Sequence, residues 1–507
     1  MFHITSSATI GISSVPVTVE TDISLGLKSF CVVGLPDACV KESRDRIRAA
    51  IKNSGFKFPR GKITVNLAPA DVRKQGPMYD LPIALSMLVA MGEIPRSAIE
   101  KAVFIGELAL DGAVRPVQGA LVTAIMAKEL EKCELFVPTL NAAEASAIHG
   151  LNVYAVGSLR EVVDHLIGID VKEKFCCEKK VWRVHHADDF SGIKGQEAVK
   201  RGLTIAASGG HNILLKGPPG AGKTLLAKSL PSILPSLTYE EAVEVTAIAS
   251  IAGALCHQQG LMDERPFRAP HHSSSAVSLV GGGAWPKPGE VSLAHRGVLF
   301  LDELPEFSRY VLEHLRQPIE DGSVTISRAV GSVQFPARFL LVAAMNPCPC
   351  GHLTNPYRHC TCSHEAVMRY QKKISGPLLD RFDIVIEVPA VEHDKLLSLE
   401  KPESSERIRS KVERSRATQR ERLKDMGLFT NNEIHSAELD VCAPLTPETR
   451  SLLETALRTN HLSARGYTRV RKVARTIADL AQSETIEAEH MAEALQYRGQ
   501  DNIQSYG

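Results

Sequence analysis

Hydrophobic and polar residues follow two different periods along the first 170 residues. Alternation from Thr9 to Asp22 predicts one strand, and apolar positions at helical spacing from Pro36 to Ser54 predict a helix that ends at Gly55. The same patterns predict strands at 29–34, 62–71, 135–137 and 153–156, helices at 80–91, 119–130, 142–148 and 159–166, and a hairpin of 102–110 with 112–117. This mixture predicts an α+β unit over residues 1–170.

Residues 171–189 are charged and lack hydrophobic periodicity, so we interpret them as a linker, although their vicinal Cys and His pairs leave a metal site as the alternative. From residue 190 to 390, helices and strands return, which indicates a second α/β unit. The predicted elements are a helix at 198–207, strands at 211–215, 298–301 and 338–346, a helix at 306–322, a hairpin at 323–336, and a helix end leading into a strand at 374–389.

The remaining residues, 391–507, are predicted to be helical. Residues 404–424 carry eight basic and three acidic residues, which favours a solvated helix with ion pairs over the alternative of a DNA contact. Periodicity resumes at Thr446 and predicts an α-helical lid, in which Ser463 can cap a helix and bring Arg465 toward the phosphates.

A glycine-rich turn between the apolar 211–215 and a helix-forming segment has the spacing G-x-x-x-x-G-K-[ST]. Such a turn directs backbone N–H groups and a helix N-terminus at a phosphate chain. Lys223 is predicted to reach the β- and γ-phosphates of ATP, and the Thr224 hydroxyl to hold Mg²⁺. The eight positions are Gly217, Pro218, Pro219, Gly220, Ala221, Gly222, Lys223 and Thr224.

Two carboxylates follow the apolar strand about eighty residues later. Asp302 is predicted to bind the magnesium ion and Glu303 to orient or deprotonate the attacking water. Asn346 ends another apolar strand, and we interpret it as the polar residue that positions this water. The alternative for Asn346 is a turn residue before Pro347.

Four cysteines form two C-x-C pairs on a loop rich in Gly, Pro and His. Two short pairs joined by a loop can bring four thiolates to one tetrahedral zinc site of the closed, structural kind, whereas buried free thiols are the alternative. His352, His359 and His364 could replace one sulfur. The four cysteines are Cys348, Cys350, Cys360 and Cys362.

Composition excludes little. The 507 residues have a formal net charge of +1, so any DNA binding must come from local patches. The longest apolar window, residues 81–92, is too short to cross a bilayer, and no signal peptide is recognisable, so we expect a cytoplasmic protein without membrane contact.

The segments QGPMYDLPIALSML and GELALDGAVRPVQGALVTAI resemble the proteolytic domain of Lon-type proteases and the C-terminal domain of the RadA repair protein. The resemblance places the Lon dyad at Met78 and near Leu121. Neither side chain can serve as nucleophile or base, so the resemblance implies the fold of residues 1–170 without the protease.

The motifs GPPGAGKT, RPFRAPHHSSSAVSLVGGG, PGEVSLAHRGVLFLDELPEF, MNPCPCG, SGPLLDRFDI and RVRKVARTIADLA together resemble the ComM/YifB family of magnesium-chelatase-like AAA+ proteins. That resemblance implies a parallel sheet in the core at 190–390, with a charged helix and lid over 391–507. It further implies a homo-hexamer that uses ATP and Mg²⁺ to drive branch migration of DNA. Ile193 would line the adenine pocket, Arg381 would reach the γ-phosphate of the adjacent subunit, and Arg465 or Arg469 would act from the lid. The alternative for Arg381 is a helix-terminal ion pair with a purely structural role.

The route of DNA remains open between two loops and a purely structural role for both. One candidate for contact with single-stranded or branched DNA is the hairpin with Arg328. The other is the loop around Arg268, His271, His272 and Lys287. A chelatase-type or protein-remodelling ATPase is the alternative function.

Overall fold

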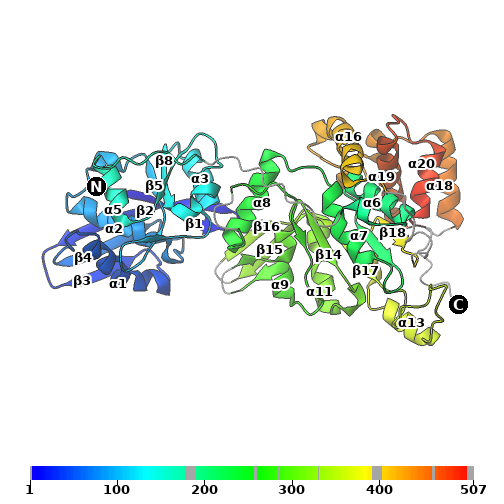
Figure 1. Cartoon of the computed structure of the whole chain (residues 1–507), viewed down its shortest axis with the longest axis horizontal. Coiled ribbons are helices and arrows are strands. Elements are labelled where there is room, and N and C mark those ends of the chain that lie inside the picture. Colours follow the sequence, from blue (N-terminus) through cyan, green and yellow to red (C-terminus); the bar gives the residue numbers. More distant parts are fainter. Residues whose placement is uncertain are drawn as a thin grey trace.

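The structure is a computed structural model that describes residues 3–176, 189–255, 260–283, 286–328, 331–390, 402–459 and 463–498. Figure 1 shows an N-terminal unit at one end, a central core, and a group of C-terminal helices at the other end. Most of the predicted linker, residues 177–188, lies outside the described residues.

The N-terminal unit is built on a seven-stranded mixed sheet with the strand order β3-β4-β2-β1-β5-β8-β9. Its strands are β1 (Ile4–Ile10), β2 (Ser13–Ser24), β3 (Ser29–Val33), β4 (Lys62–Ala68), β5 (Ala102–Phe104), β8 (Glu134–Pro138) and β9 (Asn152–Val156). Its helices are α1 (Ala38–Asn53), α2 (Asp80–Ala90), α3 (Ala120–Glu129), α4 (Ala142–Ala145) and α5 (Leu159–Leu166). Met78 and Leu121, where the resemblance to Lon places the dyad, are both buried in this unit's core.

Two sequence predictions in this unit are wrong. The single strand predicted from Thr9 to Asp22 is the hairpin β1–β2, because alternation continues across its short turn and Gly11, at φ 61°, makes that turn. The predicted hairpin of 102–110 with 112–117 is smaller, pairing only β6 (Glu107–Leu108) with β7 (Val114–Arg115). Its first part is instead the parallel strand β5 of the main sheet.

The core holds a parallel sheet of five strands in the order β11-β14-β17-β10-β18. These are β10 (Ile213–Lys216), β11 (Phe267–Arg268), β14 (Val298–Leu301), β17 (Leu340–Met345) and β18 (Ile384–Glu387). The surrounding helices are α6 (Glu197–Gly209), α7 (Lys223–Ser229), α8 (Tyr239–Ala252), α9 (Ala276–Val280), α10 (Glu290–Leu293), α13 (His364–Gln371) and α14 (Gly376–Leu379).

Two smaller hairpins lie outside this sheet. They pair β12 (Gly281–Gly282) with β13 (Lys287–Pro288), and β15 (Ser323–Arg328) with β16 (Gly331–Pro336). The predicted helix at 306–322 is two helices, α11 (Arg309–His314) and α12 (Arg316–Asp321), that join at Leu315.

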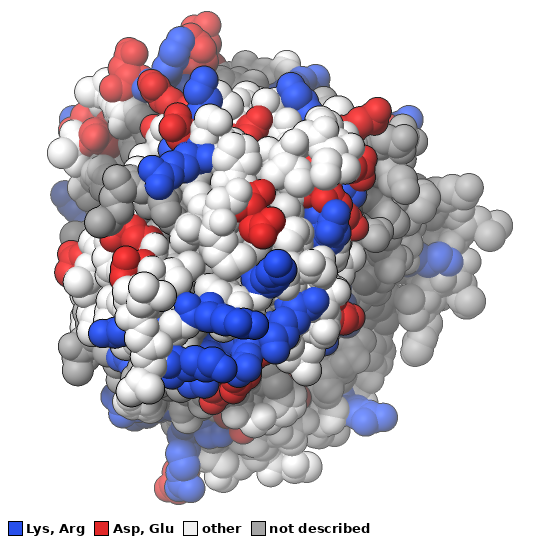
Figure 2. Space-filling view, turned by 90° about the vertical axis from the view of Figure 1, so that its left-hand side faces the viewer, with Lys and Arg blue, Asp and Glu red and all other residues white. Residues whose placement is uncertain are grey.

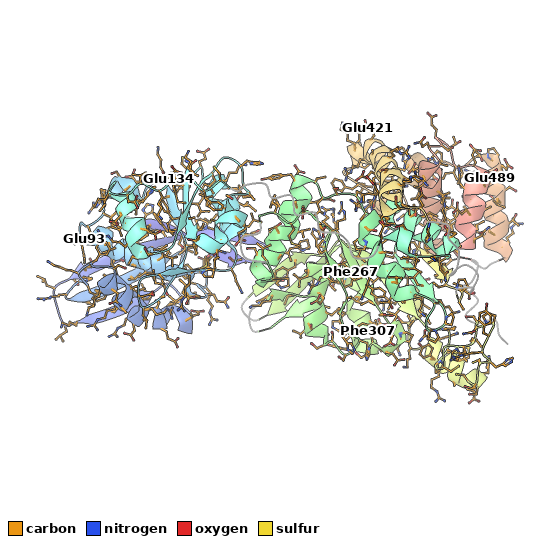
Figure 3. The ribbon with its side chains drawn as sticks, viewed as in Figure 1. Glu93, Glu134, Phe267, Phe307, Glu421 and Glu489 are labelled. Carbon is orange, nitrogen blue, oxygen red and sulfur yellow. The ribbon has the colours of Figure 1, made fainter. Side chains whose placement is uncertain are left out.

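The C-terminal helices pack on the core through α6 and bury one continuous apolar cluster with it. They are α16 (Ser405–Leu423), α17 (Leu439–Cys442), α18 (Pro447–Thr459), α19 (Ala464–Leu480) and α20 (Ala488–Gln496). Figure 3 marks Glu421 on α16 and Glu489 on α20 at the outside of this group. Inside it, the buried ring of His211 meets the Thr476 hydroxyl at 2.8 Å.

The N-terminal unit is packed against the core through α8. Ala247 belongs to the N-terminal apolar cluster, and the Tyr239 hydroxyl donates to the carbonyl of Ala147 at 3.0 Å. The Ser250 hydroxyl donates to the buried carboxylate of Glu144 at 2.6 Å. These apolar and polar contacts fix the unit on one helix of the core.

Among the described residues, none of the helices combines the length and the apolar character that a membrane crossing needs.

Candidate nucleotide-binding site

The phosphate loop connects β10 to α7, as the sequence predicts. Gly220 and Gly222 adopt φ angles of 79° and 84°, a region that other residues avoid. Gly217 approaches the neighbouring backbone so closely that a Cβ would lie 2.2 Å from the carbonyl oxygen of Val388. The glycines are therefore required by the backbone path of the loop.

Lys223 lies at the centre of the site. Its ammonium donates to the carbonyls of Gly217 at 2.7 Å and Pro218 at 2.8 Å, and to the Asn346 amide oxygen at 3.1 Å. Burial lowers the pKa of Lys223, while the carboxylates of Asp302 and Glu303 oppose that shift. The structure thus joins Lys223 and Asn346, which the sequence separates by more than one hundred residues.

Thr224 and the two acids form the other half of the site. The Thr224 hydroxyl donates to Asp302 at 2.7 Å, so the two oxygens predicted to hold Mg²⁺ already face each other. The second Asp302 oxygen accepts from the Glu303 N–H at 2.9 Å. Glu303 has a φ of 50°, a left-handed conformation that costs a non-glycine residue energy and occurs at functional sites.

All of these groups lie at the carboxyl ends of parallel strands. Lys223 follows β10, Asp302 follows β14 and Asn346 follows β17, and these strands are adjacent in the sheet. Ligands of open α/β sheets bind at this edge. A nucleotide at the phosphate loop would therefore meet the two acids and the amide together.

Arg381 lies at the amino ends of the same parallel strands, on the side of the sheet opposite to the phosphate loop. It precedes β18, which is parallel to β10, and its carbonyl accepts from Asn212 just before β10 begins. The length of a four-residue strand, about 13 Å, separates the amino ends of the strands from their carboxyl ends, where the phosphate loop lies. The Arg381 side chain is 5% exposed, donates to the Pro377 carbonyl and pairs with Glu320.

The two lid arginines have different surroundings. Arg465 is 57% exposed and pairs with Glu320 at 3.8 Å, so it lies beside Arg381. Arg469 is 14% exposed and pairs with the buried Asp383 at 3.4 Å, which joins the lid to the start of β18. The Ser463 cap is present, but it brings Arg465 to Glu320 and Arg381 rather than toward the chain's own phosphate loop.

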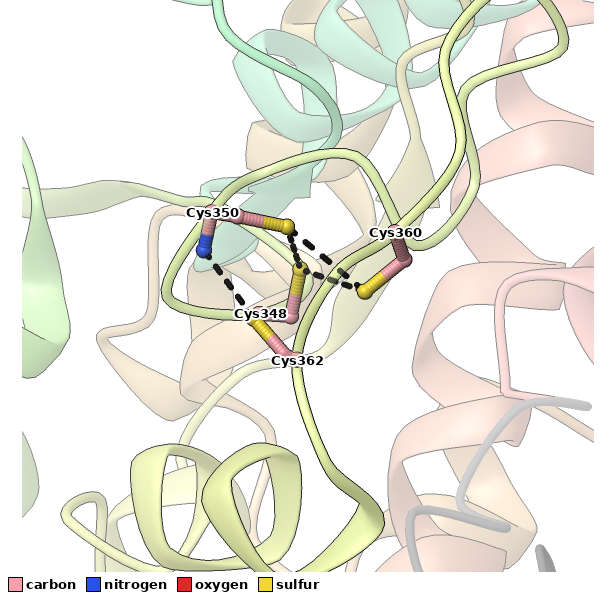
Figure 4. Close-up of side chains that lie close together, drawn as sticks. All are labelled: Cys348, Cys350, Cys360 and Cys362. Carbon is pink, nitrogen blue, oxygen red and sulfur yellow. Dashed lines mark hydrogen bonds between the residues drawn. The ribbon is translucent and has the colours of Figure 1, made fainter.

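The four cysteines converge, as their spacing predicts (Figure 4). Their sulfur atoms all lie within 4.8 Å of one another, with Cys348 3.4 Å from Cys350 and 3.7 Å from Cys360. Four thiolates 2.3 Å from a tetrahedral Zn²⁺ would lie about 3.8 Å apart, so the donor set fits zinc. The loop also contacts the phosphate loop, because a Cβ on Gly351 would lie 2.6 Å from Pro219.

Comparison with known proteins gives matches along nearly the whole chain. Residues 189–396 match the family "Magnesium chelatase, subunit ChlI", residues 402–498 match its C-terminal family, and residues 19–141 match "Subunit ChlI of Mg-chelatase". The competence protein ComM of Haemophilus influenzae is 45% identical over 97% of this chain and 96% of its own length. The uncharacterized protein YifB of Salmonella typhimurium is 44% identical over 98% and 96%.

The chain belongs to the ComM/YifB family of magnesium-chelatase-like proteins. It is therefore an AAA+ ATPase, and the family implies ATP and Mg²⁺ as its cofactors. The 38 kDa magnesium-chelatase subunit of Cereibacter sphaeroides is more distant, with 27% identity over 39% of this chain and 58% of the subunit.

The site of this ComM/YifB protein fits a magnesium nucleotide. The Lys223 ammonium is held by oxygen acceptors where phosphate oxygens can replace them, and a hydroxyl and a carboxylate are hard ligands suited to Mg²⁺. Ile193 is buried in the core, and nearby Gln196 donates to the Pro389 carbonyl at 2.7 Å. The adenine role of Ile193 stays a prediction.

One residue of the ATP site was assigned elsewhere from the sequence. His272, predicted beside possible DNA contacts, lies 3.4 Å from the Glu303 carboxylate and packs against His271 and Phe307. Phe307 is labelled in Figure 3. The available signal was position, since the PHH run follows β11, and β11 lies beside the strand that ends at the acids.

Proposed function

We propose that the chain assembles into a ring, by expectation a homo-hexamer, that couples ATP hydrolysis to movement along DNA and to branch migration. The observation that carries the proposal is the separation of Arg381 from the phosphate loop across the sheet. A residue at that edge can serve a nucleotide only in a neighbouring subunit. The name of the H. influenzae relative, a competence protein, supports DNA as the substrate.

The chain's own residues divide the chemistry between them. Bound ATP would supply the phosphoanhydride bond, and Thr224 and Asp302 would hold a Mg²⁺ ion that neutralises phosphate charge. Lys223 holds the phosphates, and Asn346, hydrogen-bonded to Lys223, orients water. Glu303 accepts the proton of that water at its carboxylate. Release from His272 would leave the Glu303 carboxylate available for this role.

Arg381 and Arg465 would act on the nucleotide of the adjacent subunit. Both now neutralise the same carboxylate of Glu320, and burial lowers the pKa of Arg381 while Glu320 opposes that shift. At a subunit interface, the phosphates would compete with Glu320 for the two guanidinium groups. Arg469 is committed to Asp383, so we assign it to holding the lid and Arg465 to the nucleotide.

Contacts in the core favour one of the two candidate DNA loops over the other. Arg268 forms a two-bond ion pair with Glu290, at 2.6 and 2.9 Å, which favours a structural role for it. The β15–β16 hairpin extends from the five-stranded sheet as a separate ribbon, with Arg328 and Gly331 paired at its tip. We assign the channel contact to this hairpin.

The decisive experiment measures ATPase activity with and without DNA. A synthetic Holliday junction and a forked duplex should each raise the turnover rate several-fold, and the wild-type protein should convert the junction to its products only with ATP. A Lys223→Ala variant, which cannot hold ATP, is the control. ATP turnover by assembled rings without a response to any DNA form would favour the protein-remodelling or chelatase-type alternative.

We also propose that the four cysteines hold one structural Zn²⁺ that fixes Asn346 and the phosphate loop. Purified protein should contain about one zinc per chain by elemental analysis. Cys350→Ser with Cys362→Ser should remove the metal and lower the melting temperature, because metal binding is coupled to the order of the loop. Cys133→Ser, an exposed cysteine in the N-terminal unit, should change neither value. If wild-type protein stripped of zinc kept the melting temperature of untreated wild type, the zinc site would be contradicted.

A further inference from the structure

Basic side chains gather on the end of the molecule that the N-terminal unit forms, far from the ATP site. Figure 2 shows this end, with a group of Lys and Arg side chains on its lower half and acidic residues mainly around them. We give the name outer basic surface to six exposed basic side chains from the C-terminal half of α1, from the loop that follows it, and from the β2–β3 loop and the start of β4. They are Lys28, Arg48, Lys52, Lys57, Arg60 and Lys62.

Local structure explains why these side chains lie together. Arg48 and Lys52 are one helical turn apart on α1, and the Arg48 guanidinium lies over the Phe58 ring at 5.8 Å. Lys62 is opposite Ser29 in the β3–β4 pairing, which places it next to Lys28. The basic side chains are therefore held on or beside regular secondary structure, α1 and the β3–β4 pair.

The positive charge is concentrated by the sequence, and the fold leaves part of it uncompensated. Residues 41–74 contain ten basic and three acidic residues, whereas the whole unit, residues 1–170, contains 17 basic and 18 acidic ones. Within the described part of the chain, Lys57, Arg60 and Lys62 form no ion pair with a carboxylate. Their charges remain available to an anionic partner.

Three arginines of the other basic segment of the chain, α16, are bound to neighbouring parts of the fold. On α16, Arg409 donates to the Ser232 carbonyl, Arg416 to the Ala207 carbonyl, and Arg422 pairs with Asp479. These bonds hold the helix on the core, in agreement with the structural interpretation of its sequence. These three arginines are committed to the fold, whereas all six residues of the outer basic surface are exposed.

DNA is the partner that the position of this surface favours. The β1–β2 turn of the same unit meets the β15–β16 hairpin, since a Cβ on Gly11 would lie 2.7 Å from Val333. The N-terminal unit is thus attached beside the hairpin assigned to the channel, and an arm of branched DNA leaving the channel would run along it. An anionic membrane is the competing partner, because Leu25 and Leu27 are fully exposed beside Lys28.

We propose that the outer basic surface binds the phosphate backbone of a DNA arm outside the ring, without sequence preference. This inference rests on the proposed function and adds a second DNA contact to it. Because the contacts are to phosphates, binding should weaken steeply with salt. Its role would be to hold one arm of a junction while the channel moves another.

The test compares two triple charge reversals in the full chain. Lys57→Glu/Arg60→Glu/Lys62→Glu alters the surface, and Lys101→Glu/Arg115→Glu/Lys128→Glu alters three exposed basic residues elsewhere on the unit. Fluorescence anisotropy measures binding of a labelled Holliday junction between 50 and 200 mM salt. The first variant should bind at least about tenfold more weakly and lose about 2.7 from the slope of log K against log salt, whereas the control variant should match wild type.

Three further readouts separate the possible failures. Basal ATPase without DNA should be unchanged in both variants, which shows that the rings are intact. If the first variant binds the junction with wild-type affinity and salt slope while DNA still stimulates its ATPase, the DNA role of the outer basic surface is overturned. If DNA does not stimulate the ATPase either, the proposed function is overturned as well. If wild type binds phosphatidylglycerol vesicles and the first variant does not, while both bind the junction equally, the partner of this surface is a membrane and not DNA.

Discussion

Glu303→Gln should reduce ATP turnover by about 100-fold or more while ATP binding stays within about threefold of wild type. The amide has nearly the shape of the carboxylate, yet it cannot accept the proton of the attacking water, and positioned general bases contribute 10²–10⁴-fold. Lys223 and Thr224, which hold the phosphates and the metal, are unaltered. Steady-state phosphate release and equilibrium binding of a fluorescent ATP analogue measure the two effects separately.

The matched variant for this prediction is His272→Ala, which removes the partner of Glu303 and keeps the carboxylate. We expect it to retain turnover within about tenfold of wild type, because the general base is still present. Glu303→Gln with a wild-type rate would remove Glu303 from the chemistry. A loss in His272→Ala as large as that in Glu303→Gln would assign the proton transfer to the pair.

Arg381→Ala should reduce turnover by about 10³-fold without loss of ATP binding, because an arginine supplied across an interface stabilises charge that develops in the transition state. The position of Arg381 leads to a more specific prediction than this loss of turnover. Since Arg381 lies at the sheet edge opposite Lys223, the two defects should complement each other. In rings assembled from equal amounts of Arg381→Ala and Lys223→Ala subunits, about a quarter of the interfaces join an intact phosphate loop to an intact arginine.

Activity of the mixture is the readout, with each variant alone as the control. The two homogeneous preparations should be inactive, and co-assembled rings should recover a measurable part of wild-type turnover. Subunit exchange, followed by fluorescence transfer between labelled copies, establishes that mixed rings exist. Mixed rings without any recovery would show that Arg381 does not act across an interface, and its pairing with Glu320 would then be its function in the fold.

Local patterns were sufficient where chemistry is contiguous in the chain. The phosphate loop, the acid pair and the four cysteines each carry their spacing within a few residues or one loop, so their geometry follows from backbone and ligand requirements. The longer helices were also predictable, because a helical period over ten or more residues reports a buried face. The β1–β2 turn was missed because strand alternation does not change across it.

The sequence by itself determined a phosphate loop ending in Lys223 and Thr224, the acids Asp302 and Glu303 at the end of an apolar strand, and a convergent cysteine loop. The tertiary structure alone decided which distant residues share a place. It brought His272 to Glu303 and Arg465 to Arg381, bound Arg268 to Glu290, and set the outer basic surface apart from the tethered arginines of α16. The reason is that strand order and helix packing set these distances, and neither leaves a period or a spacing in the chain.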